Sequence, residues 1–161
     1  MANDNMLYPL HVFRFEVDFN EQTIDPNSQG GGPVTLCSAA FSECTGLEAT
    51  MEPRVIREGG RNYGAAQRAG PVTFATVILK RGITSTRHLW QWFALVNQEY
   101  KYAHRLSATI TLMDGEGFPA LAWELENAMP IKFKLPDLNA KAEDVGVEEL
   151  HLVHEGLRAL F

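Results

Sequence analysis

The sequence is poor in cysteine and has no long apolar run. Cys37 and Cys44 are its only cysteines, and no basic segment followed by an apolar run opens the chain. Disulfide frameworks belong to oxidising compartments, so without a secretory signal we expect both thiols to be reduced. No stretch approaches the roughly 18 apolar residues of a membrane-spanning helix. We therefore expect synthesis in the cytoplasm and no membrane insertion by this chain.

Basic residues are also in short supply. The chain holds 14 lysines and arginines against 20 aspartates and glutamates, a net charge of −6. Proteins that wrap a phosphate backbone carry the opposite balance, so tight nucleic-acid binding is disfavoured. With 161 residues, of which 45% are apolar, the chain can bury one core. We expect residues 1–161 to form a single domain.

The dominant pattern in the sequence is an alternation of apolar and polar residues, which predicts strands with one buried face. The residues that share one face between positions 13 and 19 are Phe13, Phe15, Val17 and Phe19. Similar patterns predict strands at about 34–44, 47–58, 72–79, 106–112, 118–126, 129–135 and 145–155. The strand at 72–79 is apolar on both faces and should be central in its sheet. The Asp-Gly-Glu-Gly turn at 114–117 predicts a β-hairpin.

One segment follows a helical period instead. Thr84, Ser85 and Thr86 are candidate N-cap residues for a helix at about 84–98. Its apolar residues recur at helical spacing, at Leu89, Trp92, Phe93 and Val96. This stripe should cover a face of the sheet rather than bind a ligand. The order of elements predicts a mainly β fold, an antiparallel sandwich or barrel with one flanking α-helix.

Two segments have the composition of loops and contain few apolar side chains that could be buried. Residues 20–33 combine asparagine, proline, serine and three consecutive glycines, and we expect a flexible surface loop there. Residues 59–71 are rich in glycine and cations, and they hold too few large apolar residues for a core of their own. Such a segment is either mobile or ordered by a partner.

No motif indicates catalysis, a cofactor or a metal. His151, His154 and Glu155 could in principle bind zinc, but on a strand the two histidines point to opposite faces. The glycines at 30–32 lack the Lys-Ser/Thr and the following helix of a phosphate-binding loop. Neither a nucleophile elbow nor a recognised cysteine-nucleophile motif is present. We expect no catalytic, cofactor-binding or metal-binding residues.

The charged residues near the irregular loop and at strand ends allow two interpretations. Arg54, Arg57 and Arg61 lie close to the loop, whereas Lys80 and Arg81 end a predicted strand. Such charges keep a protein soluble and protect sheet edges against aggregation. They could equally pair with complementary charges on other copies, as in a ring.

Six short sequence blocks, taken in their order along the chain, resemble those of a known protein family. They are Phe-Ser-Glu-Cys-Thr-Gly-Leu-Glu at 41–48, Arg-Glu-Gly-Gly at 57–60, Leu-Lys-Arg-Gly-Ile-Thr at 79–84 leading to Leu-Trp-Gln-Trp at 89–92, Asn-Ala-Met-Pro at 127–130, Leu-Asn-Ala-Lys at 138–141 and Glu-Leu-His-Leu-Val-His-Glu-Gly-Leu at 149–157. Their order and spacing resemble the tail-tube family of contractile-tailed phages and extracellular contractile injection particles.

The resemblance implies a structural protein without enzymatic activity, a β-barrel or sandwich that forms hexameric rings. The rings would stack into a hollow inner tube within a contractile sheath. Its partners would be other copies, the sheath protein, baseplate and tube-terminating proteins, and DNA or protein payload in the lumen. The product would be assembled into a phage tail or a released injection particle.

In such proteins the hairpin at about 47–71 would reach into neighbouring subunits or the adjacent ring, and backbone pairing between copies would close the sheet. The residues expected at contacts between subunits are Leu47, Glu48, Arg54, Arg57, Glu58, Arg61, Tyr63, Arg68, Lys80, Arg81 and Glu155. Three alternatives stay open. The chain could be a tube-initiating baseplate protein of the same fold, a secreted type VI-like ring protein that carries effectors, or a hydrolase or metalloenzyme that uses His151, His154 and Glu155.

Overall fold

The computed structural model describes residues 9–21, 33–34, 41–98 and 105–161. The predicted flexible loop at 20–33 lies almost wholly outside these residues, as does Cys37, so neither prediction is tested. The strands are β1 (Phe15–Glu21), β2 (Pro33–Val34), β3 (Glu43–Thr45), β4 (Ala49–Met51), β5 (Arg54–Ile56), β6 (Ala66–Arg68), β7 (Val72–Phe74), β8 (Val77–Gly82), β9 (Leu106–Met113), β10 (Pro119–Lys134), β11 (Val147–Val153) and β12 (Gly156–Ala159), and the helix is α1 (His88–Asn97).

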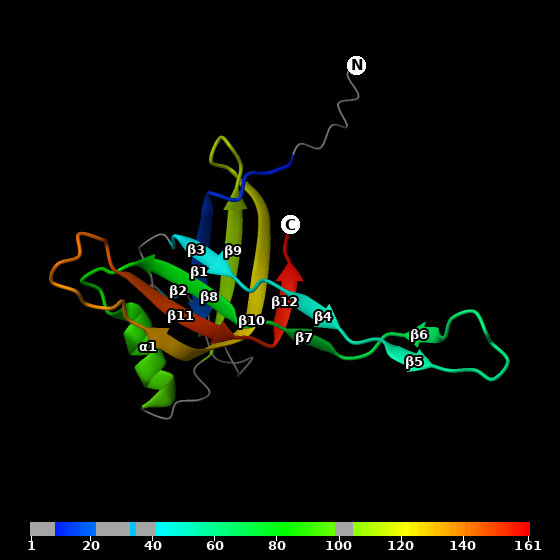
Figure 1. Ribbon diagram of the computed structural model, residues 1–161. Helices are drawn as coiled ribbons and strands as arrows, with labels where there is room; N and C mark the ends of the chain where they lie inside the picture. Colours follow the sequence, from blue (N-terminus) through cyan, green and yellow to red (C-terminus); the bar gives the residue numbers. More distant parts are fainter. Residues whose placement is uncertain (1–8, 22–32, 35–40, 99–104) are drawn as a thin grey trace, which may run out of the picture.

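The body of the molecule consists of two antiparallel sheets that share one long strand. The first half of β10 pairs with β9 and β12, and its second half pairs with β11. The order of the main sheet is β2-β1-β9-β10-β11-β8-β3. Asn127 has a φ of 51° in the middle of β10, where the pairing with β9 also shifts in register. This irregularity bends the strand, so that the two halves of the sheet run across each other (Figure 1).

The core lies between the two halves of the sheet. Its buried residues are Val17, Phe19, Phe41, Val77, Leu79, Leu89, Trp92, Val96, Leu106, Ala108, Ile110, Leu125, Ala128, Leu150 and Leu152. The mainly β architecture with one helix is therefore confirmed. Phe13 is the exception within the first predicted strand. It precedes β1 and is 68% exposed, because the strand begins only at Phe15.

The helix closes one side of this core. Leu89, Trp92 and Val96 are its buried residues, as the helical spacing predicts. The ring of Trp92 packs edge-on against Phe19 of β1, with centroids 5.4 Å apart. The predicted start at residue 84 is wrong: α1 begins at His88, because the hydroxyls of Thr84 and Thr86 bond each other at 2.8 Å and no side chain caps the helix.

Residues 47–75 form an arm that extends away from the body as a two-stranded ribbon (Figure 1). The predicted strand at 47–58 is divided into β4 and β5. The predicted strand at 72–79 is also divided, and only its second part, β8, is central: it lies between β3 and β11 and buries Val77 and Leu79. Its first part, β7, leaves the body and pairs with β4.

The turn at 114–117 joins β9 to β10 as predicted, and Asp114 accepts hydrogen bonds from the backbone of Glu116 and Phe118, each at 2.9 Å. The predicted strands at 118–126 and 129–135 are one continuous strand, β10. The predicted strand at 145–155 ends at Val153, and the chain then turns into β12, which pairs with β10.

Candidate assembly interface

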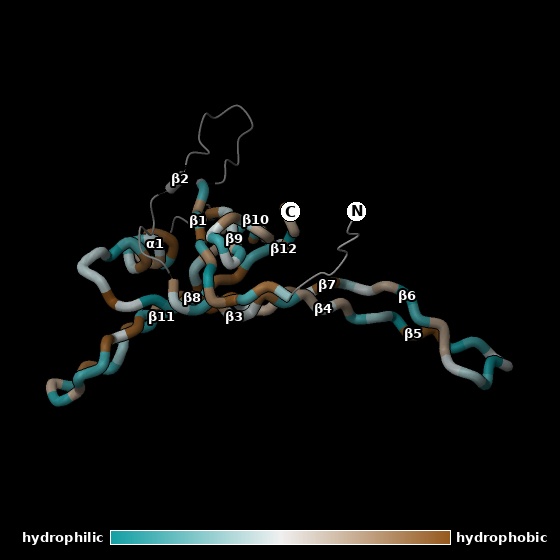
Figure 2. Tube along the Cα trace, turned by 90° about the horizontal axis from the view of Figure 1, so that it is seen from above, coloured by the Kyte–Doolittle hydropathy of each residue, from teal (hydrophilic) through white to brown (hydrophobic). Residues whose placement is uncertain are grey.

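The arm has no core of its own, and the ring contact of Phe74 with His154 of the body, with centroids 5.0 Å apart, lies at its base. From residue 47 to residue 75 not one residue is buried. Figure 2 shows the arm projecting to one side of the molecule, with apolar positions along its length. A ribbon of two strands is marginally stable in water by itself, so an ordered arm of this length indicates a partner surface.

One face of the β4–β7 ribbon is apolar. Ala49 lies opposite Phe74 and Met51 lies opposite Val72, so these four side chains share a face. Met51 is 45% exposed and Val72 is 52% exposed. The other face carries Thr50 opposite Thr73, whose hydroxyl donates to the Thr50 carbonyl oxygen at 3.4 Å. The apolar face is that of a half-buried sheet, yet among the described residues only His154 packs against it, at Phe74, and Met51 and Val72 stay exposed.

Two glycines set the path of the arm. Gly46 has a φ of +86°, and a Cβ atom there would lie 2.0 Å from the carbonyl oxygen of Thr76. A Cβ atom at Gly70 would lie 1.8 Å from the carbonyl oxygen of Glu52. The pairing keeps one register from β3–β8 through β4–β7 and then shifts by one residue before β5–β6. Only glycine allows the backbones to approach so closely at these two points.

The outer part of the arm is cationic. Arg54 lies directly opposite Arg68 in the β5–β6 pair, a like-charged arrangement that destabilises an isolated ribbon. Arg57 also has no ion pair within the described residues, and Arg61 makes only a long one, at 3.9 Å, with Glu58. Among the described residues, Arg54, Arg57 and Arg68 thus present guanidinium groups without an ion pair.

The predicted contact residues divide into two groups in the structure. Leu47, Glu48, Arg54, Arg57, Glu58, Arg61, Tyr63 and Arg68 all lie exposed on the arm. Lys80 and Glu155 lie on the body and already have partners in their own chain. Lys80 pairs with Glu43 at 3.2 Å, and Glu155 pairs with Arg105 at 2.6 Å.

Arg81 does not suit a contact between subunits. It is 1% exposed and pairs with the buried carboxylate of Glu148, its cross-strand neighbour. The reason lies in the alternation along β8: Arg81 continues the face that buries Val77 and Leu79. This alternation was visible in the sequence, and it outweighs the general tendency of arginine to be exposed.

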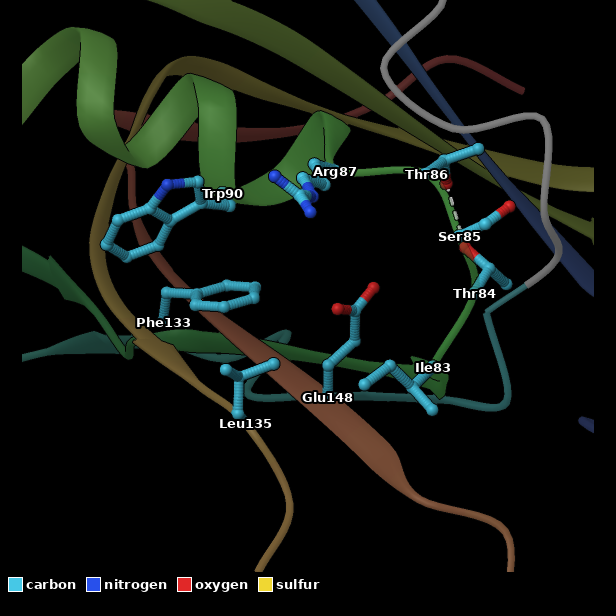
Figure 3. A pocket seen from close by; sticks show the side chains of 9 residues that line it. All are labelled: Ile83, Thr84, Ser85, Thr86, Arg87, Trp90, Phe133, Leu135 and Glu148. Carbon is cyan, nitrogen blue, oxygen red and sulfur yellow. Dashed lines mark hydrogen bonds between the residues drawn. The ribbon is translucent and has the colours of Figure 1, made fainter. Parts of the chain in front are cut away.

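A hollow of about 560 Å³ opens next to this ion pair (Figure 3). Trp90, Phe133 and Leu135 form its apolar wall, and a rim of hydroxyls follows from residues 84–86. Arg87 and Glu148 are the charged side chains in its lining, and Glu148 is already engaged by Arg81. The lining therefore offers no pair of carboxyl or imidazole groups for proton transfer.

His151 lies on β11 and His154 lies in the turn after it, and both make local hydrogen bonds. The His151 ring donates to Glu149 at 3.2 Å, and this bond is the main cause that lowers the pKa of Glu149. His154 donates from Nδ1 to the Gly156 carbonyl oxygen at 2.9 Å, while burial lowers the pKa of His154. Within the described ranges, no three His, Cys, Asp or Glu side chains are grouped so that they could hold a metal ion.

The geometry defines a class: a mainly β structural protein with a packed body and an exposed two-stranded arm. A family model for the T4-like virus tail tube protein gp19 matches residues 11–158, and the chain belongs to this family. It is a tail tube protein, and the structure has the tail-tube fold. No curated protein sequence matches the chain. In the part of the chain that the structure describes, no helix is long and apolar enough to cross a membrane.

Solved structures agree with this assignment. A chain of the anti-feeding prophage baseplate, determined with six-fold symmetry, is 26% identical with a TM-score of 0.78, over 96% of this chain and 97% of that chain. A chain of the sheath–tube complex of the extracellular contractile injection system PVC, in its extended state, is 20% identical with a TM-score of 0.74, over 98% and 95%. A chain of the PVC sheath/tube terminator is 20% identical with a TM-score of 0.75, over 97% and 99%.

Proposed function

We propose that the protein is the structural inner-tube subunit of a contractile tail or injection particle, and that it forms hexameric rings that stack into a hollow conduit. The observation that carries the proposal is the arm, whose apolar β4–β7 face lies exposed in the protomer. Burying this face against another copy removes the exposed apolar surface from water. The six-fold symmetry of the related baseplate supports six copies per ring.

The partners follow from the same relatives. The related chains come from a baseplate, a sheath–tube complex and a tube terminator, which supports contacts with sheath, baseplate and terminating proteins. In this function the chain is made in the cytoplasm and then built into a phage tail or a released particle. It conducts DNA or protein payload and catalyses no reaction. Membership of the phage tail tube family favours this branch over a type VI-like ring protein.

Substitutions on the two faces of the arm test the proposal. Met51→Asp or Val72→Asp places a carboxylate on the apolar face and should abolish rings and tubes, because a buried unpaired charge opposes assembly. The matched control, Thr73→Asp, places the same charge on the opposite face of the ribbon. It should assemble better than either variant of the apolar face. Negative-stain microscopy and sedimentation velocity measure the outcome. Normal tubes from Val72→Asp, or a wild-type chain that stays monomeric with its partner proteins present, would contradict the proposal.

A second candidate is the subunit that starts the tube on the baseplate. The observation in its favour is that the baseplate relative, at 26% identity, is more similar in sequence than the two PVC chains at 20%. Labelling of the chain in intact particles separates the two functions. A repeating subunit is found along the whole tube, whereas an initiator is found only at the baseplate end.

A further inference from the structure

The loop between β10 and β11 forms a second hollow, of about 800 Å³, which shares Ile83 with the hollow beside α1 and lies on the side of the body away from the arm. Its lining combines aliphatic side chains with carboxylates, and the residues are Ile83, Pro136, Asp137, Leu138, Asn139, Ala140, Ala142, Asp144, Val145, Gly146 and Val147. Leu138 is 91% exposed and Val145 is 79% exposed. Neither Asp137 nor Asp144 has an ion pair within the described residues. We refer to this hollow and its rim, residues 135–147, as the acidic loop.

The tip of the arm, residues 57–65, is its chemical complement. Tyr63 is 98% exposed, so its ring has almost no contact with its own chain. Arg57 and Arg61 precede it in the tip, both exposed, and Arg61 lies 3.9 Å from Glu58. The like-charged Arg54 and Arg68 lie in the adjacent β5–β6 pair. Gly60 and Gly64 have φ angles of +82° and +74° and hold the tip in its turned shape. Tyrosine and arginine are the residues that most often anchor protein interfaces.

The two features lie at opposite ends of the molecule. Figure 2 shows the arm projecting on one side and the loop before β11 projecting on the other. A patch at one end that fits a patch at the other makes a head-to-tail contact, which yields closed rings or helical stacks from one kind of chain. This is the assembly geometry that a tube requires.

We propose that the tip of the arm of one copy docks in the acidic loop of another copy. Tyr63 fills the hollow between Leu138 and Val145, and Arg57 and Arg61 pair with Asp137 and Asp144. The inference rests on the proposed function, since it names the surface that receives the arm. The hollow beside α1 is the weaker receptor, because its single carboxylate, Glu148, is already engaged by Arg81 and its rim adds another cation, Arg87.

Charge reversal tests the pairing in the full chain. Arg57→Glu with Arg61→Glu should raise the protein concentration needed for assembly by about tenfold or more, and so should Asp137→Lys with Asp144→Lys. Combining all four reversals in one chain should restore assembly. The matched control Glu116→Lys reverses an exposed carboxylate in the β9–β10 turn and should leave assembly unchanged. Single-site loss without rescue in the combined variant would overturn the pairing.

Photo-crosslinking tests the location directly. A benzoylphenylalanine at position 63, in a chain mixed with isotopically labelled wild type, should crosslink to residues 135–147 of the labelled chain, as read by mass spectrometry. Rings that form with crosslinks to residues 84–90 or 133–134, or to any segment outside the lining of this hollow, would overturn this inference and leave the proposed function intact. Failure of the wild-type chain to assemble at all would overturn both.

Discussion

Arg81 and Glu148 are charged side chains that the fold draws into its interior. Both lie on strand faces that bury leucine at the next position: Leu79 precedes Arg81 on its face, and Leu150 follows Glu148. Because the side chains of a strand alternate, a strand that buries those leucines must turn the charged residues inward too. Pairing across the β8–β11 ladder satisfies the two charges together.

We predict that Glu148→Gln lowers the free energy of unfolding by about 3 kcal/mol or more, because it leaves the Arg81 guanidinium buried without its counter-charge. Urea unfolding in the Val72→Asp background measures the loss without interference from assembly. The double variant Arg81→Met with Glu148→Leu should be less destabilised than Glu148→Gln, since it removes both charges. A double variant that is the less stable of the two would contradict this account.

His154 makes the fold sensitive to mild acid. Its Nδ1 proton is donated to Gly156, and its buried Nε2 atom has no hydrogen-bond partner among the described residues. The centroids of the His154 and Phe74 rings are 5.0 Å apart. Burial lowers the pKa of His154 in the folded state, so the unfolded state binds the proton first as the pH falls. The contribution to stability is complete above the ordinary histidine pKa of about 6.5 and is lost as the pH falls below it.

The resulting prediction is a free energy of unfolding that falls between pH 7.5 and pH 5. His154→Gln should make this fall shallower, because glutamine does not titrate in that range. Urea unfolding at a series of pH values, in an assembly-defective background, gives both slopes. Equal slopes in the two proteins would show that other groups cause the pH dependence.

At the scale of elements, the arm depends on glycine where it leaves the body. Gly46 combines a left-handed φ with a backbone contact that a methyl group would occupy, whereas a Cβ atom at Gly59 would meet nothing within 4 Å. Gly46→Ala therefore requires either strain or a displaced ribbon, at a cost of about 1–3 kcal/mol. Gly59→Ala changes the same residue type within the arm and should cost far less.

We expect Gly46→Ala to impair assembly and to weaken the β3–β8 pairing, whereas Gly59→Ala should assemble normally. Hydrogen exchange of the amides in β3 and β8 reports the pairing, and sedimentation reports the assembly. Assembly and exchange in Gly46→Ala that match those of the wild type would contradict the role of this glycine.

The elements themselves were predictable where a single physical rule decides them. The helix follows from the spacing of Leu89, Trp92 and Val96, and the β9–β10 hairpin follows from its turn residues. The points at which the strands are interrupted could not be predicted from the alternation of apolar and polar residues. Residues 72–79 alternate without interruption, yet β7 belongs to the arm and β8 to the core, because the chain leaves the body between them.

At the scale of the whole molecule, the described residues form a packed body and an arm that, apart from Phe74 at its base, has no contact with the core. The body contains the entire core, from Val17 to Leu152, and the arm contributes no residue to it. Stability of the body and order of the arm should therefore be separable. The body should fold in an assembly-defective chain, and the arm should be protected only in the assembly.

Hydrogen exchange on the two forms checks this separation. In Val72→Asp, amides of residues 49–56 and 66–74 should exchange quickly, whereas in wild-type tubes they should exchange about a hundredfold more slowly or slower still. Amides of β8 and β11 should be protected in both. Arm amides equally protected in the monomer would mean that the arm is stable by itself, and the need for a second copy would disappear.

The candidate interface could be predicted from the sequence only in part. A segment at 59–71 with almost nothing to bury cannot form a core, so the sequence indicated that it is either mobile or ordered by a partner. The buried position of Arg81 was open to prediction from alternation on β8. The acidic loop was not, because the hollow between Leu138 and Val145 exists only once the backbone of residues 135–146 has turned back on itself.

By itself, the sequence determined the mainly β character, the one helix and the membership of the tail tube family, because periodicity and ordered residue blocks act locally along the chain. Only the tertiary structure decided which strands belong to the body and which to the arm, and that a cationic tip and an acidic loop lie at opposite ends. These features arise from strand pairing between residues distant in sequence, and such pairing depends on how the whole chain packs rather than on any single segment.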